Sequence, residues 1–408
     1  MNLIILAWSY LKSRPLTTVL NVVLLALGTG VITLLILFGN QLEEKITANA
    51  KGVDLVVGAK GSPMQLILCS VFHIDFPTGN INLKEAERIA RHPLVKKAIP
   101  MALGDSYRGF RIVGTRRDYA ELYAAELAEG KWWEQHLEVA IGATVARQLG
   151  LKLGDEFVSA HGLAEDGHDH EAHHYKVVGI VKPGGTVLDN LILTNVQSIW
   201  LAHDLEVGPA GNAAPSNLVP GHLAGDSSRE VTSLLVQYRN PLAVIQLPRF
   251  INQQSSMQAA APAYETARLF SILGVGADVL RGFALVLILV SGLSIFLVLY
   301  NSMKERRYDL AIMRSMGAGR GKLFTAVVLE GTFLTALGTV SGLALGHAVV
   351  WIFAATVPQA AASGIQGGVW YVAETWVLGG SLVLGVICSL VPALQAYKTD
   401  IHTVLAGN

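Results

Sequence analysis

Four long apolar blocks stand out from the mixed polar sequence around them. Only the third block along the chain contains an acidic residue, Glu330. A helix needs roughly 20 mostly apolar residues to cross a bilayer, and each block is about that long. The pattern predicts membrane-spanning helices over residues 16–39, 279–300, 323–353 and 376–396.

A secretory signal peptide is the alternative for the first block, because Lys12 and Arg14 precede it. The block is longer than a signal core, and residues 39–44 contain no small-x-small cleavage site. We therefore expect a retained helix.

The segment before the first block, residues 1–15, is itself apolar. Trp8 and Tyr10 are side chains that favour the membrane interface, and Pro15 allows a turn into the first spanning helix. The alternative is a longer first helix, but the break at residues 12–15 argues against it. We predict a cytoplasmic interfacial helix that contacts the lipid membrane.

Basic residues predict the orientation, because Lys and Arg collect on the cytoplasmic side of membrane helices. The loop at 354–375 has no Lys or Arg, whereas the loop at 301–322 contains Lys304, Arg306, Arg307, Arg314, Arg320 and Lys322. Both termini, including the tail at 397–408, and the 301–322 loop are therefore predicted to be cytoplasmic. Residues 40–278 and the 354–375 loop are predicted to be outside, in the periplasm of a bacterium.

The segment 40–278 is long enough to bury its own core. Alternating apolar residues predict strands, and amphipathic stretches with stop signals such as Gly150 predict helices. The predicted strands are 53–58, 108–113, 138–142, 155–160, 175–181 and 231–238, and the predicted helices are 83–91, 118–127, 143–149 and 241–254. The fold class is four α-helical membrane spans with an α+β periplasmic domain inserted between helices 1 and 2.

Residues 264–281 carry charged residues at near-helical spacing, and we expect them to continue into the second spanning helix. A flexible joint is the alternative. Residues 204–228 are rich in Gly, Pro, Ala and Asn, which predicts a long loop.

Composition excludes several classes of protein. The chain is 51% hydrophobic and 15% charged, with 31 basic and 31 acidic residues, so no basic surplus indicates a nucleic-acid partner. High hydrophobicity with zero net charge excludes global disorder. Two cysteines, Cys69 and Cys388, exclude a disulfide framework, and their placement in the outer domain and in helix 4 separates them.

A histidine-rich segment at 161–174 is the strongest candidate for metal chemistry. Acidic residues are interleaved with its five histidines, a combination that suits Zn²⁺. The candidate ligands are His161, His168, His170, His173 and His174. The alternative is a solvated polar loop between two strands, for which pH response is one variant.

Two motifs in the chain resemble enzyme signatures but lack their context. His-Glu-x-x-His at 170–174 fits a zinc protease only on a stable helix, whereas this segment is short and runs into a predicted strand. Residues 317–323 resemble a P-loop, but the glycine spacing is short and Leu323 replaces the Ser/Thr that holds magnesium. We therefore expect no catalytic residues and no ATP site within the chain, so it is not itself an enzyme.

The third spanning helix contains two ionisable residues, Glu330 and His347, which we expect near its cytoplasmic and outer ends. It also contains a repeat of glycines at spacing four, Gly338, Gly342 and Gly346. Such a stripe lets helices approach closely, within the bundle or across a dimer.

Three sequence features, together with the layout of one helix, a large outer domain and three more helices, resemble the permease subunits of ABC transporters of the MacB/LolC/FtsX type. The entry to helix 1, residues 13–20, is similar to the Arg-x-x-x-Thr start of that family. Residues 304–318 are similar to its coupling segment. Residues 391–405 are similar to its closing pattern, although Asp400 stands where a proline is common.

The resemblance implies a homodimer that binds two copies of a separate ATPase and moves its periplasmic domain mechanically, a mechanism called mechanotransmission. The ATPase would contact the coupling segment, through Glu305, Arg306, Arg307, Asp309, Leu310, Ile312, Met313, Arg314, Met316 and Gly317. An apolar stripe of Leu310, Ile312, Met313 and Met316 is suited to a groove on a soluble partner. A basic membrane flank is the alternative for this loop.

The function implied is the permease of an ABC transporter for export or envelope transport, with a zinc link and a periplasmic partner protein left open. The alternative is a metal-responsive membrane regulator of envelope enzymes or partner proteins, with the histidine segment as its sensor.

Overall fold

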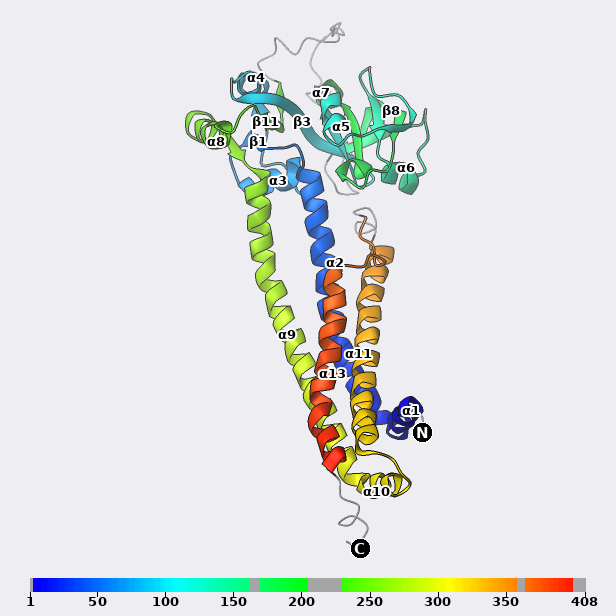
Figure 1. Ribbon diagram of the computed structural model, residues 1–408. Helices are drawn as coiled ribbons and strands as arrows, with labels where there is room; N and C mark the ends of the chain where they lie inside the picture. Colours follow the sequence, from blue (N-terminus) through cyan, green and yellow to red (C-terminus); the bar gives the residue numbers. More distant parts are fainter. Residues whose placement is uncertain (1–2, 162–168, 205–228, 358–363, 399–408) are drawn as a thin grey trace. The chain divides into compact units, whose positions relative to one another are not determined.

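The computed structural model describes residues 3–161, 169–204, 229–357 and 364–398. The chain divides into two compact units, each of which is described by itself (Figure 1). The helical unit comprises the described residues of 1–42 and 272–408, and the outer unit comprises those of 43–271. The predicted loop at 204–228 lies almost wholly outside the described residues.

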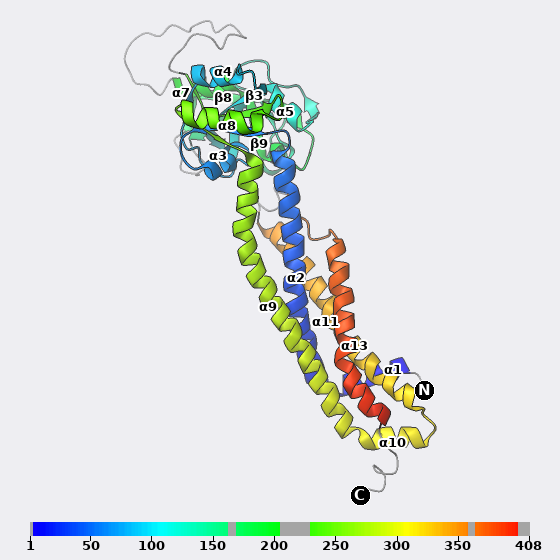
Figure 2. The same ribbon diagram turned by 60° about the vertical axis from the view of Figure 1, so that its left-hand side comes forward.

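The helical unit contains four helices that are long and apolar enough to cross a membrane, which confirms the predicted fold class. They are α2 (Pro15–Ala50), α9 (Pro262–Glu305), α11 (Arg320–Thr356) and α13 (Val372–Lys398). Two shorter helices, α1 (Leu3–Ser13) and α10 (Arg307–Ser315), lie at the same end of this bundle in Figures 1 and 2.

Two of the long helices extend well beyond the predicted spans. Helix α2 continues to Ala50 and α9 begins at Pro262, so each contains residues of both units. The expectation that 264–281 is helical and continuous with the second span is confirmed. Hydropathy marks only the part of a helix that lipid must cover, which is why the polar continuation of α2 was missed.

The glycine stripe of α11 packs within the bundle, against α2. A methyl group on Gly338 would meet Leu25 at 2.8 Å, and one on Gly342 would meet the Thr29 hydroxyl at 1.9 Å and the Ala26 carbonyl at 2.7 Å. Of the two arrangements that the sequence allowed, the structure therefore shows packing inside one chain. Helix α9 differs, because Gly274, Gly276 and Gly282 have no described neighbour within 4 Å.

The outer unit is built on a ten-stranded mixed sheet, in the order β12-β1-β11-β3-β4-β9-β6-β8-β5 with β7 paired to β3 and β8. The strands are β1 (Leu55–Ala59), β3 (Val95–Tyr107), β4 (Phe110–Thr115), β5 (Leu127–Gly130), β6 (Glu138–Ile141), β7 (Glu156–His161), β8 (Asp169–Val181), β9 (Leu191–Asn195), β11 (Ser233–Tyr238) and β12 (Met257–Ala260). A separate pair joins β2 (Ile81–Asn82) to β10 (Glu230–Val231).

Helices cover both faces of this sheet. They are α3 (Pro63–Ser70), α4 (Leu83–Ala90), α5 (Arg117–Leu122), α6 (Ala143–Leu149), α7 (Val196–Asp204) and α8 (Ala243–Gln254), with a 3-10 turn η1 at Val187–Asn190. Alternate residues of β1 enter different cores, with Leu55 and Val57 packing on the side of α4, α7 and α8, and Val56 on the side of α3 and α5. Both faces of the strand are buried, so the polar–apolar alternation of a half-exposed strand is absent.

Local signals predicted several of these elements well. Asn82 caps α4 by accepting a hydrogen bond from the Lys84 N–H, and Gly150 ends α6 at φ +69°. No helix was predicted between residues 58 and 83, but Ser62 caps α3 there and Pro63 occupies its first turn. Strand β3 was missed because Lys96, Lys97 and Pro100 interrupt its apolar residues.

Candidate coupling site

The junction between α9 and α10 is a single residue, Arg306. Its backbone N–H donates to the Ser302 carbonyl at 3.0 Å, and its own carbonyl accepts from the Leu310 N–H at 3.0 Å. The backbone therefore passes from one helix to the next with no intervening loop. Helix α10 is therefore attached to the end of α9 through Arg306 alone.

The Arg306 side chain is buried inside the helical unit instead of reaching toward solvent. Its Nη1 lies 3.4 Å from Glu330 Oε2 of α11, and its guanidinium lies 3.8 Å from the centre of the Tyr10 ring of α1. The side chains of Arg306 and Glu330 are 9% and 6% exposed. A buried charge is tolerated when it is paired, and here the Glu330 carboxylate neutralises the arginine while the Tyr10 ring makes a cation–π contact with it.

A second ion pair joins the same elements at a more exposed position. Arg14, between α1 and α2, donates to the Glu305 carboxylate at the end of α9. Tyr10 and Arg14 were not predicted as partners of the coupling segment, because Arg14 and Glu305 are separated by 291 positions in the sequence. Together the two pairs tie α1, α9 and α11 at the start of α10.

The apolar stripe predicted on α10 proves to be divided, which corrects the expectation that all four residues face a partner. Leu310 is buried and Met313 packs beside it, both in a cluster with residues of this chain's own helices. The other members of that cluster are Met303, Leu323, Phe324, Val327, Val328, Ala393 and Ala396. The helix needs this anchor because nine residues alone do not form a stable helix in water.

The opposite face of α10 is exposed. Tyr308, Asp309, Ile312, Ser315 and the C-cap residue Met316 follow the spacing i, i+1, i+4, i+7, i+8, which places them on one side of the helix. Tyr308 is 55% exposed and Met316 is 76% exposed, whereas Ile312 is half-buried. We name these five residues the α10 outer face. Gly317 follows at φ +94°, a conformation that ends the helix.

Arg307 and Arg314 are the two remaining predicted coupling residues of α10. Arg314 is half-buried and makes contacts with its own chain, and the side chain of Arg307 lies outside the described set. Glu305 and Arg306 are engaged by Arg14 and Glu330 as described above. Some residues of the site therefore hold α10 against the helical bundle, and others form the exposed face of α10.

The outer end of α2 is held inside the outer unit by three hydrogen bonds. Tyr123 donates its hydroxyl to the Asn49 carbonyl at 2.8 Å, Asn49 Oδ1 accepts from the Val187 N–H at 3.0 Å, and Lys45 Nζ donates to the Gly185 carbonyl at 3.0 Å. Burial raises the pKa of Tyr123 to about 12, so its hydroxyl remains a donor at neutral pH. These bonds attach α2 to the loop before η1.

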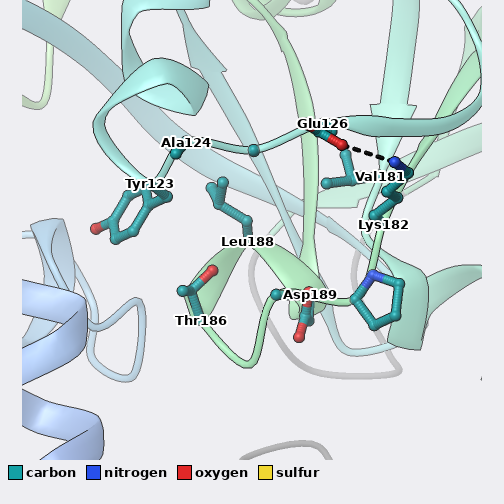
Figure 3. A pocket seen from close by; sticks show the side chains of 11 residues that line it. Tyr123, Ala124, Glu126, Val181, Lys182, Thr186, Leu188 and Asp189 are labelled. Carbon is teal, nitrogen blue, oxygen red and sulfur yellow. Dashed lines mark hydrogen bonds and ion pairs between the residues drawn. The ribbon is translucent and has the colours of Figure 1, made fainter.

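A pocket of about 160 Å³ lies between Tyr123 and that loop (Figure 3). Its charged side chains are largely engaged: Lys182 pairs with Glu126 at 2.6 Å, and both oxygens of Asp189 accept backbone N–H groups, from Gly184 and Gly185. The pocket therefore lies beside the segments that hold the end of α2.

The histidine-rich segment forms part of a hairpin. Strands β7 and β8 pair antiparallel, with Val158 opposite His174 and Ala160 opposite Asp169, so His161 and His170 lie at the same end. Residues 162–168, including His168, lie outside the described residues, as do the side chains of His161, His170 and His173, while His174 is exposed. Among the residues that were described, no group of three His, Cys, Asp or Glu is placed to hold a metal.

The strand conformation of residues 169–174 also bears on the His-Glu-x-x-His motif at 170–174. A His-Glu-x-x-His zinc site needs its two histidines one turn apart on a helix, and here the segment belongs to β8. The structure agrees with the expectation that this motif is not a protease signature.

Cys69 is buried and Cys388 is partly buried, and both are free thiols.

Two family profiles match the chain. The MacB-like periplasmic core domain matches residues 18–246, and the FtsX-like permease C-terminal domain matches residues 281–401. The first covers more than half of the chain, including the outer end of α2 and most of the outer unit. The second covers the junction, α10 and the two last long helices.

Curated relatives agree with these profiles. The macrolide export ATP-binding/permease protein MacB of Hyphomonas neptunium is 30% identical over 147 residues, which are 36% of this chain and 21% of the relative. The pyoverdine export ATP-binding/permease protein PvdT of Pseudomonas aeruginosa is 20% identical over 98% of this chain and 58% of its own length. The part of the chain that aligns covers 32%, 58% and 66% of the length of three curated permease relatives. The crystal structure of the periplasmic region of MacB from Actinobacillus actinomycetemcomitans aligns with 55% of the chain and 97% of its own, at 10% identity and a TM-score of 0.33.

Proposed function

Because this chain belongs to the ABC transporter permeases of the MacB/FtsX type, we propose that it couples ATP hydrolysis by a separate ATPase to movement of its periplasmic domain. The family and the four apolar helices make it a multi-pass protein of the inner membrane with a periplasmic domain. The output is export or envelope transport. Two of the relatives named above are named for the export of macrolides and of pyoverdine.

The observation that supports this proposal best is the division of α10. Leu310 and Met313 anchor the helix on its own bundle, while Tyr308 and Met316 present apolar surface away from it. An anchored helix with an exposed apolar face suits a groove on a soluble partner. We propose that the α10 outer face contacts the ATPase. Glu305 and Arg306 hold the helix in place and do not themselves contact the ATPase.

The route from this face to the outer unit follows continuous helices. Helix α9 is unbroken from Glu305 to Pro262, where it is preceded directly by β12 of the large sheet. Helix α2 reaches Asn49, which is hydrogen-bonded within the outer unit. We propose that ATP-driven displacement of α10 reaches the sheet through α9 and the η1 loop through α2, which is the mechanotransmission expected of the family.

Replacing Tyr308 and Met316 together with alanine should disrupt ATPase binding. The change removes the largest exposed apolar side chains of α10 and leaves its anchor intact, so the chain should still fold. We expect at least a tenfold loss of affinity, corresponding to about 1.4 kcal/mol or more. The measurement is co-purification of the ABC ATPase that accompanies the unaltered chain from its own host, identified by mass spectrometry.

The matched control replaces Ile4 and Ile5 with alanine, which removes exposed apolar side chains from α1 at the same end of the bundle. That variant should retain the ATPase. Equal retention of the ATPase by the Tyr308/Met316 variant would exclude the α10 outer face as its docking surface.

We propose that two copies of this chain associate and bind two ATPases. Large side chains along α2 and α9 remain exposed in one copy, including Leu16, Val19, Phe283 and Leu289. Lipid covers such a surface in the monomer, and a second copy would cover part of it in the homodimer. A periplasmic partner protein remains a further proposal, to be tested by cross-linking in intact cells.

We further propose that the histidine-rich hairpin binds zinc, either linked to transport or as the sensor of a metal-responsive regulator. The register that brings His161 and His170 to one end of the hairpin favours this proposal. After dialysis, the purified chain should hold one zinc ion, and a variant with His168, His170, His173 and His174 replaced by alanine should hold none. Elemental analysis measures both, with a His92/His136 alanine variant as control, and absence of zinc from the unaltered chain would overturn the proposal.

A further inference from the structure

A buried carboxylate lies in the large sheet beside the histidine-rich hairpin. Asp105 belongs to β3 and is 1% exposed. Its position is paired with that of His161 in β7, so the two residues stand directly opposite each other on antiparallel strands. Residues in such a pair have Cβ atoms about 5 Å apart, which is close enough for an aspartate and a histidine to bind one metal ion.

Asp105 lies on the face of the sheet that carries an aromatic stack. The rings of Tyr107, Phe157 and Tyr175, from β3, β7 and β8, are stacked in series with centroids 4.4 and 5.8 Å apart. Burial raises the pKa of Tyr175, and the Asp105 carboxylate raises it further because it would repel a phenolate. The carboxylate therefore faces the phenol, in surroundings from which most water is excluded.

An arginine on the neighbouring strand faces the other side of the sheet. Arg111 of β4 is paired with Ser106, the residue that follows Asp105, so it lies on the opposite face. There its Nη1 donates to Cys69 Sγ of α3 at 3.5 Å. Buried charges are paired with an opposite charge or coordinate a metal, and Arg111 does not fill that role for Asp105.

Two hydroxyl groups on the face of Asp105 complete the surroundings. Ser159 of β7 and Tyr175 of β8 are fully buried, and neither hydroxyl is in normal hydrogen-bonding geometry with another described residue. Leaving a buried hydroxyl without a partner costs free energy. Carboxylates that bind metals are held by hydrogen bonds from such neighbouring groups. The two hydroxyls are therefore suited to orienting a metal-bound carboxylate.

We propose that Asp105 is a ligand of the zinc ion in the histidine-rich hairpin, together with His161 opposite it. The hydroxyls of Ser159 and Tyr175 orient its carboxylate. A carboxylate combined with imidazoles is an ordinary donor set for Zn²⁺. This inference rests on the zinc proposal above and adds to it a ligand from β3, outside the histidine-rich segment.

The same register removes one histidine from the ligand set. His174 is paired with Val158, the residue between Phe157 and Ser159, and it is exposed. Because successive residues of a strand face opposite sides of a sheet, His174 lies on the face opposite to Asp105. We expect His174→Ala to bind zinc with unchanged affinity.

Cobalt(II) provides a direct readout of ligation, since it occupies zinc sites and gives a strong near-ultraviolet charge-transfer band when a cysteine thiolate binds it. The experiment uses the full-length chain in detergent, freed of metal by chelation and titrated with cobalt(II) chloride. Asp105→Cys should gain this band. The unaltered chain should lack it, because Cys69 contacts Arg111 on the other face of the sheet and Cys388 belongs to α13.

Two further variants separate ligation from a structural role. Ser106→Cys is the matched control, because it places the same thiol one residue along β3 on the opposite face, and it should not gain the band. Asp105→Asn keeps the size of the side chain but removes its charge. It should weaken zinc binding at least about a hundredfold, since even groups that only orient a ligand contribute up to that much.

The outcomes distinguish this inference from the zinc proposal itself. If the unaltered chain binds cobalt but Asp105→Cys gains no band, or Ser106→Cys gains the same band, Asp105 is not a ligand and zinc binding by the hairpin still stands. Unchanged zinc affinity in Asp105→Asn leads to the same conclusion. If the unaltered chain binds neither metal, both proposals are wrong. The band in Asp105→Cys is a gain of signal, so it decides the question even if Asp105→Asn fails to fold.

Discussion

Gly342→Ala is expected to unfold or misassemble the helical unit. The added methyl group would lie 1.9 Å from the Thr29 hydroxyl, 2.7 Å from the Ala26 carbonyl and 3.0 Å from the Gly30 nitrogen. Two of these neighbours are backbone atoms of α2, so no rotamer change relieves the contact and the helices must separate. Overpacking of this kind costs about 3 kcal/mol. Thermal unfolding in detergent should show a large decrease in the midpoint temperature.

Replacing a glycine that has open space around it distinguishes the effect of crowding from the effect of helix propensity. Gly282→Ala in α9 has open space around the new methyl group, and alanine favours a helix by about 1 kcal/mol over glycine. That variant should keep or raise the midpoint. If Gly342→Ala behaved like Gly282→Ala, the close α2–α11 packing would be wrong. Thr29→Ala in the Gly342→Ala background should recover only part of the loss, because the Ala26 carbonyl remains.

Glu330→Ala is expected to have a comparable effect at the coupling end. The substitution leaves the Arg306 guanidinium buried beside Tyr10 without its carboxylate, and breaking a buried pair from one side costs about 3–5 kcal/mol. Because Arg306 is the whole junction between α9 and α10, the loss should also weaken ATPase binding. Thermal unfolding and ATPase co-purification measure the two effects separately.

The exposed pair Asp278–Arg281 on α9 provides the comparison. Its side chains are 70% and 58% exposed, so Asp278→Ala should cost less than about 1 kcal/mol. Replacing both Arg306 and Glu330 with leucine should recover most of the stability lost in Glu330→Ala, since no buried charge then remains. Equal stability of Glu330→Ala and Asp278→Ala would contradict the buried pair.

Local and periodic signals predicted the parts of the fold that depend on neighbouring residues. The four spans, the helix α4 and the α6 stop at Gly150 each need only a short window of sequence. Strand β3 was missed because its support comes from β11 and β4, which lie in other windows. Its lysines and proline hide a strand that the sheet stabilises from both sides.

The coupling segment shows the same division within a single motif. Its apolar stripe was identified in the sequence, but a stripe of four apolar residues does not reveal which of them pack against the bundle itself. The stripe assigns Leu310 to a partner, whereas in the structure Leu310 packs in a cluster with Met303 and Ala393 of its own chain. Likewise, Arg306 could not be separated from the basic flank without knowing that Glu330 and Tyr10 approach it from other helices.

The three unpacked glycines of α9 have a mechanical consequence for the longest helix of the chain. Gly274, Gly276 and Gly282 each lower helix stability by about 1 kcal/mol relative to alanine, and no described neighbour compensates. The stretch that contains them is therefore less stable as a helix than the same stretch with alanines, within a helix of 44 residues. In the coupling proposed above, a force applied at Glu305 would bend this section before it reached the sheet. Bending of this section would delay the transmission of a rapid displacement, so that the two ends of α9 need not move simultaneously.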